Sequence, residues 1–255
     1  MVKTNIAIVT QARFGSSRLK GKILKEVEGK SLLEIHLNRL KKSLHSNTLV
    51  VATTLEPESS HIINIAKKIG CSYYQGSTDD VLDRFYNAVK PFNPTIVVRI
   101  TSDCPLVDPT LIDNMIHRLI EQQIDYCSNT INPTYPDGFD CEVFTFDALK
   151  KAWVEAKLRS EREHVTPYIW KNSTYHNNNL FKSSSYENNI DHSHLRLTVD
   201  NQADFDLIKI IIETLGDNKT WEEYTAFLLK HPDLININKH LTRNEGYEKS
   251  IKADN

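Results

Sequence analysis

The sequence predicts an α/β fold with a mostly parallel central sheet covered by helices on both faces. Two observations lead to this prediction: short apolar runs of β type alternate with helical patterns through the first half of the chain, and 40% of the 255 residues are apolar, enough for a substantial core. A chain of this length suits one domain, 1–255, with a smaller elaboration at about 125–195, where the alternation loosens. We expect this elaboration to include a β-arm and a dimer interface.

The elements of the first half follow one another in strand–helix order. NIAIVT (5–10) indicates a buried strand, and SLLEIHLNRLKKSL (31–44) a helix, in which Ser31 and Glu34 can form a capping box. TLVVATT (48–54) predicts a second strand, and Pro57 opens the helix that follows it. The remaining expected elements are a short strand at 72–75, a helix at 79–90, a strand at 95–101 and a helix at 109–122.

The second half is less regular. The stretch 172–194 is rich in Asn, Ser and His, which favours an exposed segment or a β-arm, and the last ~10 residues look frayed. The other expected elements are strands at 125–130 and 140–146, helices at 147–157 and 161–172, a strand at 195–200 (LRLTVD), a strong helix at 202–215 and an amphipathic helix at 221–229.

The composition argues against several classes of protein. The formal net charge of −2 gives no broad attraction to nucleic acid or to an anionic membrane, and no apolar run approaches the roughly 18 residues of a membrane helix. The N-terminus lacks the pattern of a signal peptide. The four cysteines are widely spaced without a CxxC pair, which argues against a zinc site and fits reduced thiols. We therefore expect a cytoplasmic protein without a nucleic-acid or membrane partner.

Polar clusters follow several of the predicted strands, where open α/β sheets bind their ligands. The segment QARFGSSRLKGKIL, 11–24, follows the first strand and carries arginines and lysines but no carboxylate. Asp103 follows the strand at 95–101, and Asp200 ends the late strand. Mg²⁺ prefers one or two carboxylates, with phosphate oxygens and water completing its shell. Carboxylates beside a basic loop therefore suggest a magnesium–triphosphate site.

Each of these features also has a structural interpretation. The basic loop departs from the Walker pattern, because five residues separate Gly15 from Gly21 and Ile23 stands where Ser or Thr is required. It could therefore be a solvated surface loop. Asp103 could cap a turn or the next helix, and Asp200 could cap the helix that follows it.

Two further polar groups occur later in the chain. Asp140 and Glu142 alternate onto one face of a predicted strand, where they could bind a second metal or sugar hydroxyls, or form a solvated face. Arg162, Glu163 and His164 precede a helix interrupted by a proline. A histidine beside a glutamate could act as a base or hold a substrate carboxylate, and a simple helix-start cluster is the alternative.

The ordered set of motifs resembles a known family. The loop at 11–24 is similar to the nucleotide-binding signature of the cytidylyltransferases that make CMP-activated sugar acids. The whole chain resembles the spore-coat polysaccharide biosynthesis F-type cytidylyltransferase family, related to the CMP-Kdo and acylneuraminate cytidylyltransferases. The stretches that carry the resemblance are QARFGSSRLKGKIL, VVATT, GSTDDVLDRFYNA, RITSDCPLVDP, YPDGFDCEVFTFDAL, EREHVTPYIW, LRLTVDNQADF and NEGYEKS.

The resemblance implies a three-layer, glycosyltransferase-A-like nucleotide-diphospho-sugar transferase fold that binds CTP with Mg²⁺ as cofactor. It implies catalytic roles for Arg13, Lys22 and Asp103, and metal binding by Asp103 and Asp200. Two positions depart from the family: Thr101-Ser102 precede Asp103 where related synthetases carry Gln or Asn-Gly, and Lys20 replaces a common proline. The nucleotide-binding residues that the resemblance implies are Gln11, Ala12, Arg13, Ser17, Arg18, Lys22, Thr53, Thr54, Thr101 and Asp103.

The implied reaction transfers CMP from CTP to a sugar acid or related acceptor and releases pyrophosphate, in surface polysaccharide or glycan biosynthesis. A glycosyltransferase of the same broad fold, using a nucleotide-sugar donor, is an alternative, for which Asp140-Cys141-Glu142 is the nearest match to a DxD pair. A non-catalytic sugar- or nucleotide-binding protein is a second alternative. We expect a homodimer, and we expect the acceptor to contact Asp140, Glu142, Arg162, Glu163 and His164.

Overall fold

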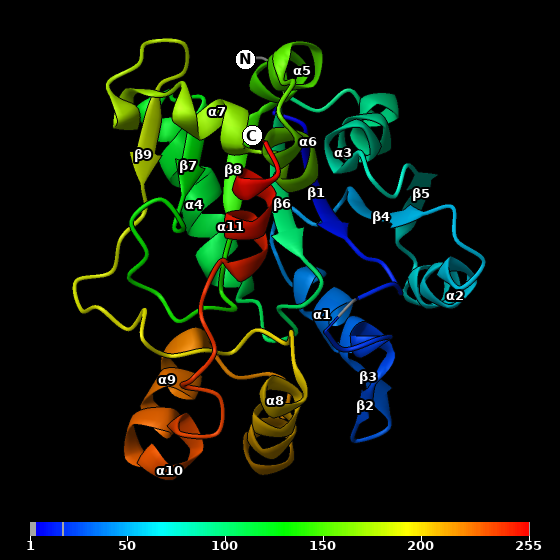
Figure 1. Cartoon of the computed structure of the whole chain (residues 1–255), viewed down its shortest axis with the longest axis vertical. Helices are drawn as coiled ribbons and strands as arrows, with labels where there is room; N and C mark the ends of the chain where they lie inside the picture. Colours follow the sequence, from blue (N-terminus) through cyan, green and yellow to red (C-terminus); the bar gives the residue numbers. More distant parts are fainter. Residues whose placement is uncertain (1–3, 17, 255) are drawn as a thin grey trace.

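The computed structural model describes residues 4–16 and 18–254, and a seven-stranded sheet lies at its centre (Figure 1). Four neighbouring strands run parallel, whereas β8 is antiparallel to its neighbours β6 and β7. The predicted mostly parallel α/β sheet is therefore confirmed. In order across the sheet the strands are β5 (Ser72–Gly76), β4 (Leu49–Thr54), β1 (Ile6–Gln11), β6 (Ile96–Thr101), β8 (Glu142–Thr145), β7 (Tyr126–Ser128) and β9 (Ser183–Ser185).

Helices cover both faces of this sheet, because successive strand residues point to opposite sides. Ile8 of β1 belongs to one hydrophobic cluster and Val9 to the other. The helices α1 (Leu32–Leu40), α2 (Ser59–Ile69), α4 (Pro109–Gln122) and α8 (Gln202–Leu215) contribute to the first cluster. The helices α3 (Val81–Val89), α5 (Phe146–Glu155) and α7 (Pro167–Lys171) contribute to the second.

Smaller elements complete the described chain. The predicted capping box of α1 is confirmed, since Ser31 Oγ accepts from Glu34 N at 3.2 Å and Glu34 Oε2 accepts from Ser31 N at 2.9 Å. No helix of the described residues is both long enough and apolar enough to cross a membrane. The remaining elements are the β2 (Glu26–Val27) and β3 (Lys30–Ser31) hairpin, helices α6 (Arg159–His164), α9 (Trp221–Lys230), α10 (Pro232–Ile235) and α11 (Glu245–Lys252), and 3₁₀ turns η1 (Lys22–Leu24), η2 (Lys90–Phe92) and η3 (Thr174–His176).

Three expectations for the second half were wrong in detail. The segment 195–200 is extended but forms no strand, because its β-pairing is limited to one isolated bridge between Arg196 and Asp137. The helix expected at 161–172 is two helices, α6 and α7, separated by Val165, whose φ is 72°. The C-terminal residues expected to fray form the helix α11, which packs against α6 in front of the sheet (Figure 1).

Candidate active site

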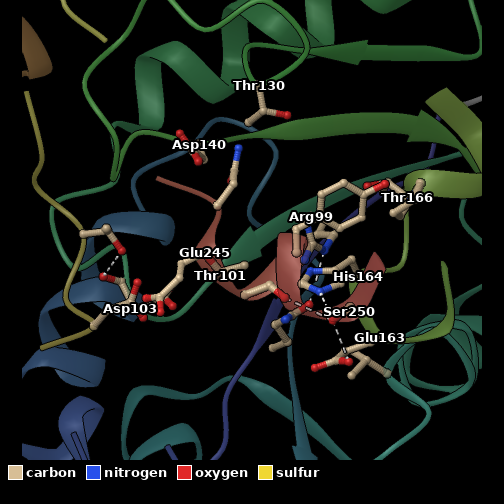
Figure 2. A pocket seen from close by; sticks show the side chains of 18 of the residues that line it. Arg99, Thr101, Asp103, Thr130, Asp140, Glu163, His164, Thr166, Glu245 and Ser250 are labelled. Atoms are coloured by element: carbon tan, nitrogen blue, oxygen red, sulfur yellow. Dashed lines mark hydrogen bonds between the residues drawn. The ribbon is translucent and has the colours of Figure 1, made fainter. Parts of the chain in front are cut away.

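A cavity of about 1380 Å³ lies beyond the carboxyl ends of β1 and β6. The loop after β1, the start of α3, the end of β6 and the loops between 130 and 142 form part of its wall. Helices α6, α7 and α11 form much of the rest. Figure 2 shows Asp103 and Thr101 at the end of β6, with Glu245 and Ser250 of α11 facing the same space. Parallel strand ends thus create the site at the edge predicted from the sequence.

Lys22 bridges the two aspartates of the predicted metal site. Its Nζ lies 3.0 Å from Asp103 Oδ2 and 2.8 Å from Asp200 Oδ1. The Lys22 side chain is 12% exposed, and those of Asp103 and Asp200 are 28% and 15% exposed. The basic loop, the turn after β6 and the end of the extended segment 195–200 thus meet at one nitrogen atom.

Local backbone geometry explains how these three groups meet. Gly21 has a φ of 66°, and a Cβ at this position would lie 3.0 Å from the Phe14 ring, so glycine turns the loop and delivers Lys22 into η1. On the other side, Val199 N donates to the Asp103 carbonyl oxygen at 2.8 Å. This bond fixes the chain ahead of Asp200 beside the end of β6.

Neither aspartate caps a helix. The N-cap of α4 is Asp108, whose Oδ1 accepts from Thr110 N at 2.8 Å, and the N-cap of α8 is Asn201. The carboxylates of Asp103 and Asp200 are directed to Lys22 instead. The helix-capping interpretation of both residues is therefore wrong.

Two arginines surround Asp200. Arg18 Nη2 lies 2.7 Å from Asp200 Oδ1, and Arg18 Nη1 lies 2.9 Å from Glu245 Oε2 of α11. Arg196 Nη2 lies 3.0 Å from Asp200 Oδ2 and pairs with two further buried carboxylates. In this arrangement Arg18 and Lys22 of the basic loop are both neutralised by carboxylates of the protein.

The ion pairs set the protonation states of the aspartate–lysine cluster. Burial alone would raise the pKa of Asp103, but the Lys22 ammonium and the Thr101 hydroxyl outweigh it and hold the pKa well below its usual range. Burial would lower the pKa of Lys22, but the charges of Asp103 and Asp200 raise it above its ordinary value. Both shifts favour the ionised forms of Asp103 and Lys22 at neutral pH.

A second ion pair lines the cavity, on β6 and β8. Arg99 Nη1 pairs with Glu142 Oε2, and Arg99 Nε donates to Gln11 Oε1 at 3.2 Å. Glu142 Oε1 accepts from Tyr126 Oη and from Thr166 Oγ1, both at 2.5 Å. Glu142 is thus satisfied by internal donors, and it holds Arg99 in place.

The predicted Glu163–His164 pair meets α11. Ser250 Oγ lies 3.0 Å from His164 Nε2 and donates to Glu163 Oε2 at 2.9 Å (Figure 2). Burial lowers the pKa of His164 to about 4, and the Arg99 guanidinium adds to the effect, so the imidazole is neutral at pH 7. The next residue, Val165, adopts a positive φ that costs a β-branched residue roughly 1–3 kcal/mol.

The cavity brings together most of the sequence-predicted residues but leaves some outside. Thr53 and Thr54 are wholly buried and bond to Ser59, outside the lining. Arg162 is also outside the lining and pairs with Asp80 at 2.5 Å. Ser17 lies outside the described residues. The predicted residues that line the cavity are Gln11, Ala12, Arg13, Arg18, Lys22, Thr101, Asp103, Asp140, Glu142, Glu163, His164 and Asp200.

The sequence interpretation missed the helix α11 and four cavity-lining arginines, Arg84, Arg99, Arg159 and Arg196. Arg99 and Arg196 interrupt the apolar runs TIVVRIT and LRLTV, and Arg84 lies in α3 with a side chain only 2% exposed. A cation inside an apolar strand pattern is costly unless it is paired, so it was a usable signal. Residues 245–252 gave no comparable signal of a helix because their pattern is mostly polar, although NEGYEKS (244–250) belongs to the stretches that carry the family resemblance.

Comparison with known proteins agrees with this geometry. A family model described as cytidylyltransferase matches residues 6–231. The spore coat polysaccharide biosynthesis protein SpsF of Bacillus subtilis is 30% identical over 243 residues, covering 90% of this chain and 96% of that protein.

Solved structures share the fold. A cytidylyltransferase from Leptospira borgpetersenii is 34% identical with a TM-score of 0.86, covering 94% of this chain and 99% of that one. A CMP:2-keto-3-deoxy-manno-octonic acid synthetase complexed with CTP has a TM-score of 0.63 at 15% identity, covering 83% and 99%, and it supports the fold alone. The matched family, with the near full-length similarity to SpsF, shows that the chain belongs to the cytidylyltransferase family of nucleotidyltransferase enzymes.

Proposed function

We propose that this enzyme transfers CMP from CTP to a sugar acid and releases pyrophosphate. The observation that supports this most directly is the cluster in which Lys22 Nζ joins Asp103 and Asp200, at the end of a basic loop in a member of the cytidylyltransferase family. The cluster combines the two things that phosphoryl transfer from a nucleotide requires. These are cations for the phosphates and paired carboxylates for a divalent cation.

The basic loop supplies the triphosphate contacts in this proposal. Arg13 is exposed in the cavity wall, while Arg18 and Lys22 are held by carboxylates until a stronger anion arrives. Phosphate oxygens accept charge-assisted hydrogen bonds from both kinds of side chain. We therefore propose that CTP draws Arg18 and Lys22 away from the protein carboxylates and onto its β and γ phosphates.

The residues present fit a divalent cation, which we propose to be Mg²⁺. The Lys22 ammonium favours the ionised form of Asp103, and the carboxylate oxygens of Asp103 and Asp200 share this ammonium, so the position between them already favours positive charge. Among the described residues no cluster of three or more His, Cys, Asp or Glu side chains is placed for a metal. Two carboxylates completed by phosphate oxygens are the donor set that Mg²⁺ prefers. The chemistry supplied there is polarisation of the phosphoryl oxygens and a lower pKa for the acceptor hydroxyl.

The protein's own contribution is electrostatic. Attack on the α-phosphorus places growing negative charge on the pyrophosphate that leaves, and Arg13, Arg18 and Lys22 stabilise that charge. Removing one such group costs about 10²–10³ in rate. We expect Asp103→Asn and Lys22→Ala each to reduce pyrophosphate release by at least this factor in protein that remains folded.

The other end of the cavity is our proposed acceptor site. Glu163 and His164 line it, and Glu142 and Arg162 act behind them through Arg99 and Asp80. Asp140, which pairs with Arg243 at 2.5 Å, lies on the side of Asp103 (Figure 2). We also propose a homodimer built through 125–195, which a monomer mass in light scattering would contradict.

Pyrophosphate release tests the function. Purified protein with MgCl₂ and a panel of sugar acids should release pyrophosphate from CTP at least tenfold faster than from ATP, GTP or UTP. A glycosyltransferase would instead consume a nucleotide-sugar donor in the same buffer and release none from CTP. A non-catalytic binding protein would bind CTP without turnover.

A further inference from the structure

We propose that Arg99 binds the carboxylate of the acceptor and thereby selects sugar acids over neutral sugars. This inference rests on the proposed function and assigns a specificity residue to it. Figure 2 shows where Arg99 lies: it stands beside His164 and near Thr166, and Thr101 lies between this group and Asp103 in the view. Arg99 therefore lies at the proposed acceptor end of the cavity, on the strand that leads to Asp103.

The Arg99 guanidinium is held rigidly but not fully used. Its Nε donates to Gln11 and its Nη1 to Glu142, so two of its three nitrogens are fixed by the protein. Nη2 has no hydrogen-bond partner among the described residues, and it is not fully buried. With the side chain 13% exposed, this nitrogen presents its N–H groups to the cavity. A preorganised, charged N–H donor suits a carboxylate oxygen.

Glu142 does not block this role. Its two oxygens are occupied by Arg99, Tyr126 and Thr166, and its side chain is 6% exposed, so it is a positioning residue for Arg99. One guanidinium can serve several carboxylates, as Arg196 does in this protein with Asp137, Asp200 and Asp204. A second carboxylate at Arg99 therefore follows a pattern that the fold already uses.

The other cations of the cavity are less suited to an acceptor carboxylate. In a 2-keto sugar acid that carboxylate is attached to the carbon whose hydroxyl attacks phosphorus, so its partner must lie near Asp103. Arg99 precedes Asp103 by four residues along β6 and the turn after it. Arg13, Arg18 and Lys22 belong to the phosphate loop, Arg84 and Arg196 are buried, and the side chains of Arg159 and Lys249 are 70% and 66% exposed at the rim.

The test compares a charged acceptor with its neutral form. The probes are 2-keto-3-deoxy-manno-octonate and its methyl ester, used with CTP and MgCl₂, and calorimetry measures CTP affinity separately. Arg99→Met should raise KM for the acid about 10- to 100-fold, bring the acid/ester ratio of kcat/KM close to one, and leave CTP affinity unchanged. Arg99→Lys, which keeps the charge, should retain part of the preference. The matched control is Arg118→Met, whose guanidinium lies 4.9 Å from the Tyr186 ring and outside the cavity.

Two results would overturn the inference. The first is an unchanged acid/ester ratio in Arg99→Met, and the second is CTP binding weakened as strongly as acid binding, which would assign Arg99 to the nucleotide. If the enzyme does not turn over the octonate, the kinetic test is replaced by a binding test, in which ligand-observed NMR measures pyruvate binding to the CTP-loaded protein. Wild type should then bind pyruvate and Arg99→Met should not, and absence of binding to wild type contradicts the inference. Failure of the proposed function is distinct, since no pyrophosphate would then appear from CTP with any acceptor.

Discussion

Replacing Lys22 by methionine should lower the thermal stability of the protein, and Mg²⁺ should restore it. Asp103 has no ion pair besides Lys22 among the described residues, whereas Asp200 keeps Arg18 at 2.7 Å and Arg196 at 3.0 Å. The substitution therefore leaves one carboxylate without a cation in a site that is mostly shielded from water. The loss should appear without any substrate, so it reports on the site and not on turnover.

The structure sets the size of the effect. Breaking a fully buried pair costs about 3–5 kcal/mol and an exposed one about 0–1 kcal/mol. With Lys22 12% and Asp103 28% exposed, we expect about 2–3 kcal/mol. In a chain of this length that is a fall in Tm of about 4–12 °C. Because a divalent cation supplies the missing positive charge, saturating Mg²⁺ should restore more than half of the loss.

Differential scanning calorimetry with EDTA or with MgCl₂ measures both effects. Lys30→Met is the matched control, since Lys30 pairs with Asp217 at 2.7 Å but is 50% exposed, and its Tm should change little under either condition. The double variant Lys22→Met/Asp103→Asn should show no restoration by Mg²⁺. An unchanged Tm in Lys22→Met, or equal Mg²⁺ effects in all variants, would refute the assignment of this pair as a cation site.

Three further predictions follow from particular contacts. Glu245→Gln should tighten CTP binding about 1.5- to 5-fold, because it releases Arg18 from a partly exposed ion pair. The control is Glu248→Gln, on the exposed side of α11, and an equal gain in its CTP affinity would contradict this prediction. Burial lowers the pKa of His36 to about 4, so between pH 6.5 and 4 this histidine binds a proton in the unfolded state only. The free energy of unfolding should therefore fall by about 3 kcal/mol as the pH is lowered over that range. Urea titrations at several pH values should show a smaller fall for His36→Gln. Gly138→Ala should lower the free energy of unfolding by about 3 kcal/mol or more, because φ is 114° and the new Cβ would lie 2.5 Å from the Leu197 carbonyl carbon. A loss below about 1 kcal/mol would contradict this, since the backbone would then have shifted to accommodate the Cβ.

The sequence could predict the sheet because its signals are local. Apolar runs and caps such as Ser31 with Glu34 act within a few residues, and the parallel order then brings Asp103 to the same edge as the basic loop. The segment 195–200 misled for the same reason. Its composition suits a strand, but the neighbouring chain offers it one bridge at Arg196 and no continuous ladder.

Long-range partners could not be predicted in this way. Arg99 was visible as a charge in an apolar strand, but its partner Glu142 is 43 residues away and is selected by the pairing of β6 with β8. The helix α11 depends on tertiary contacts such as Ser250 with Glu163, across 87 residues. A polar terminal helix of eight residues has little intrinsic stability, so only these contacts account for it.

The central claim is CMP transfer from CTP, and ³¹P NMR of the reaction mixture tests it most directly. With CTP, MgCl₂ and a sugar acid, we predict a new phosphodiester signal together with one equivalent of pyrophosphate. Asp103→Asn should lower the rate about 10²–10³-fold while its circular dichroism spectrum matches that of the wild type. Orthophosphate with CDP, or no reaction of CTP with any sugar acid, would contradict the account.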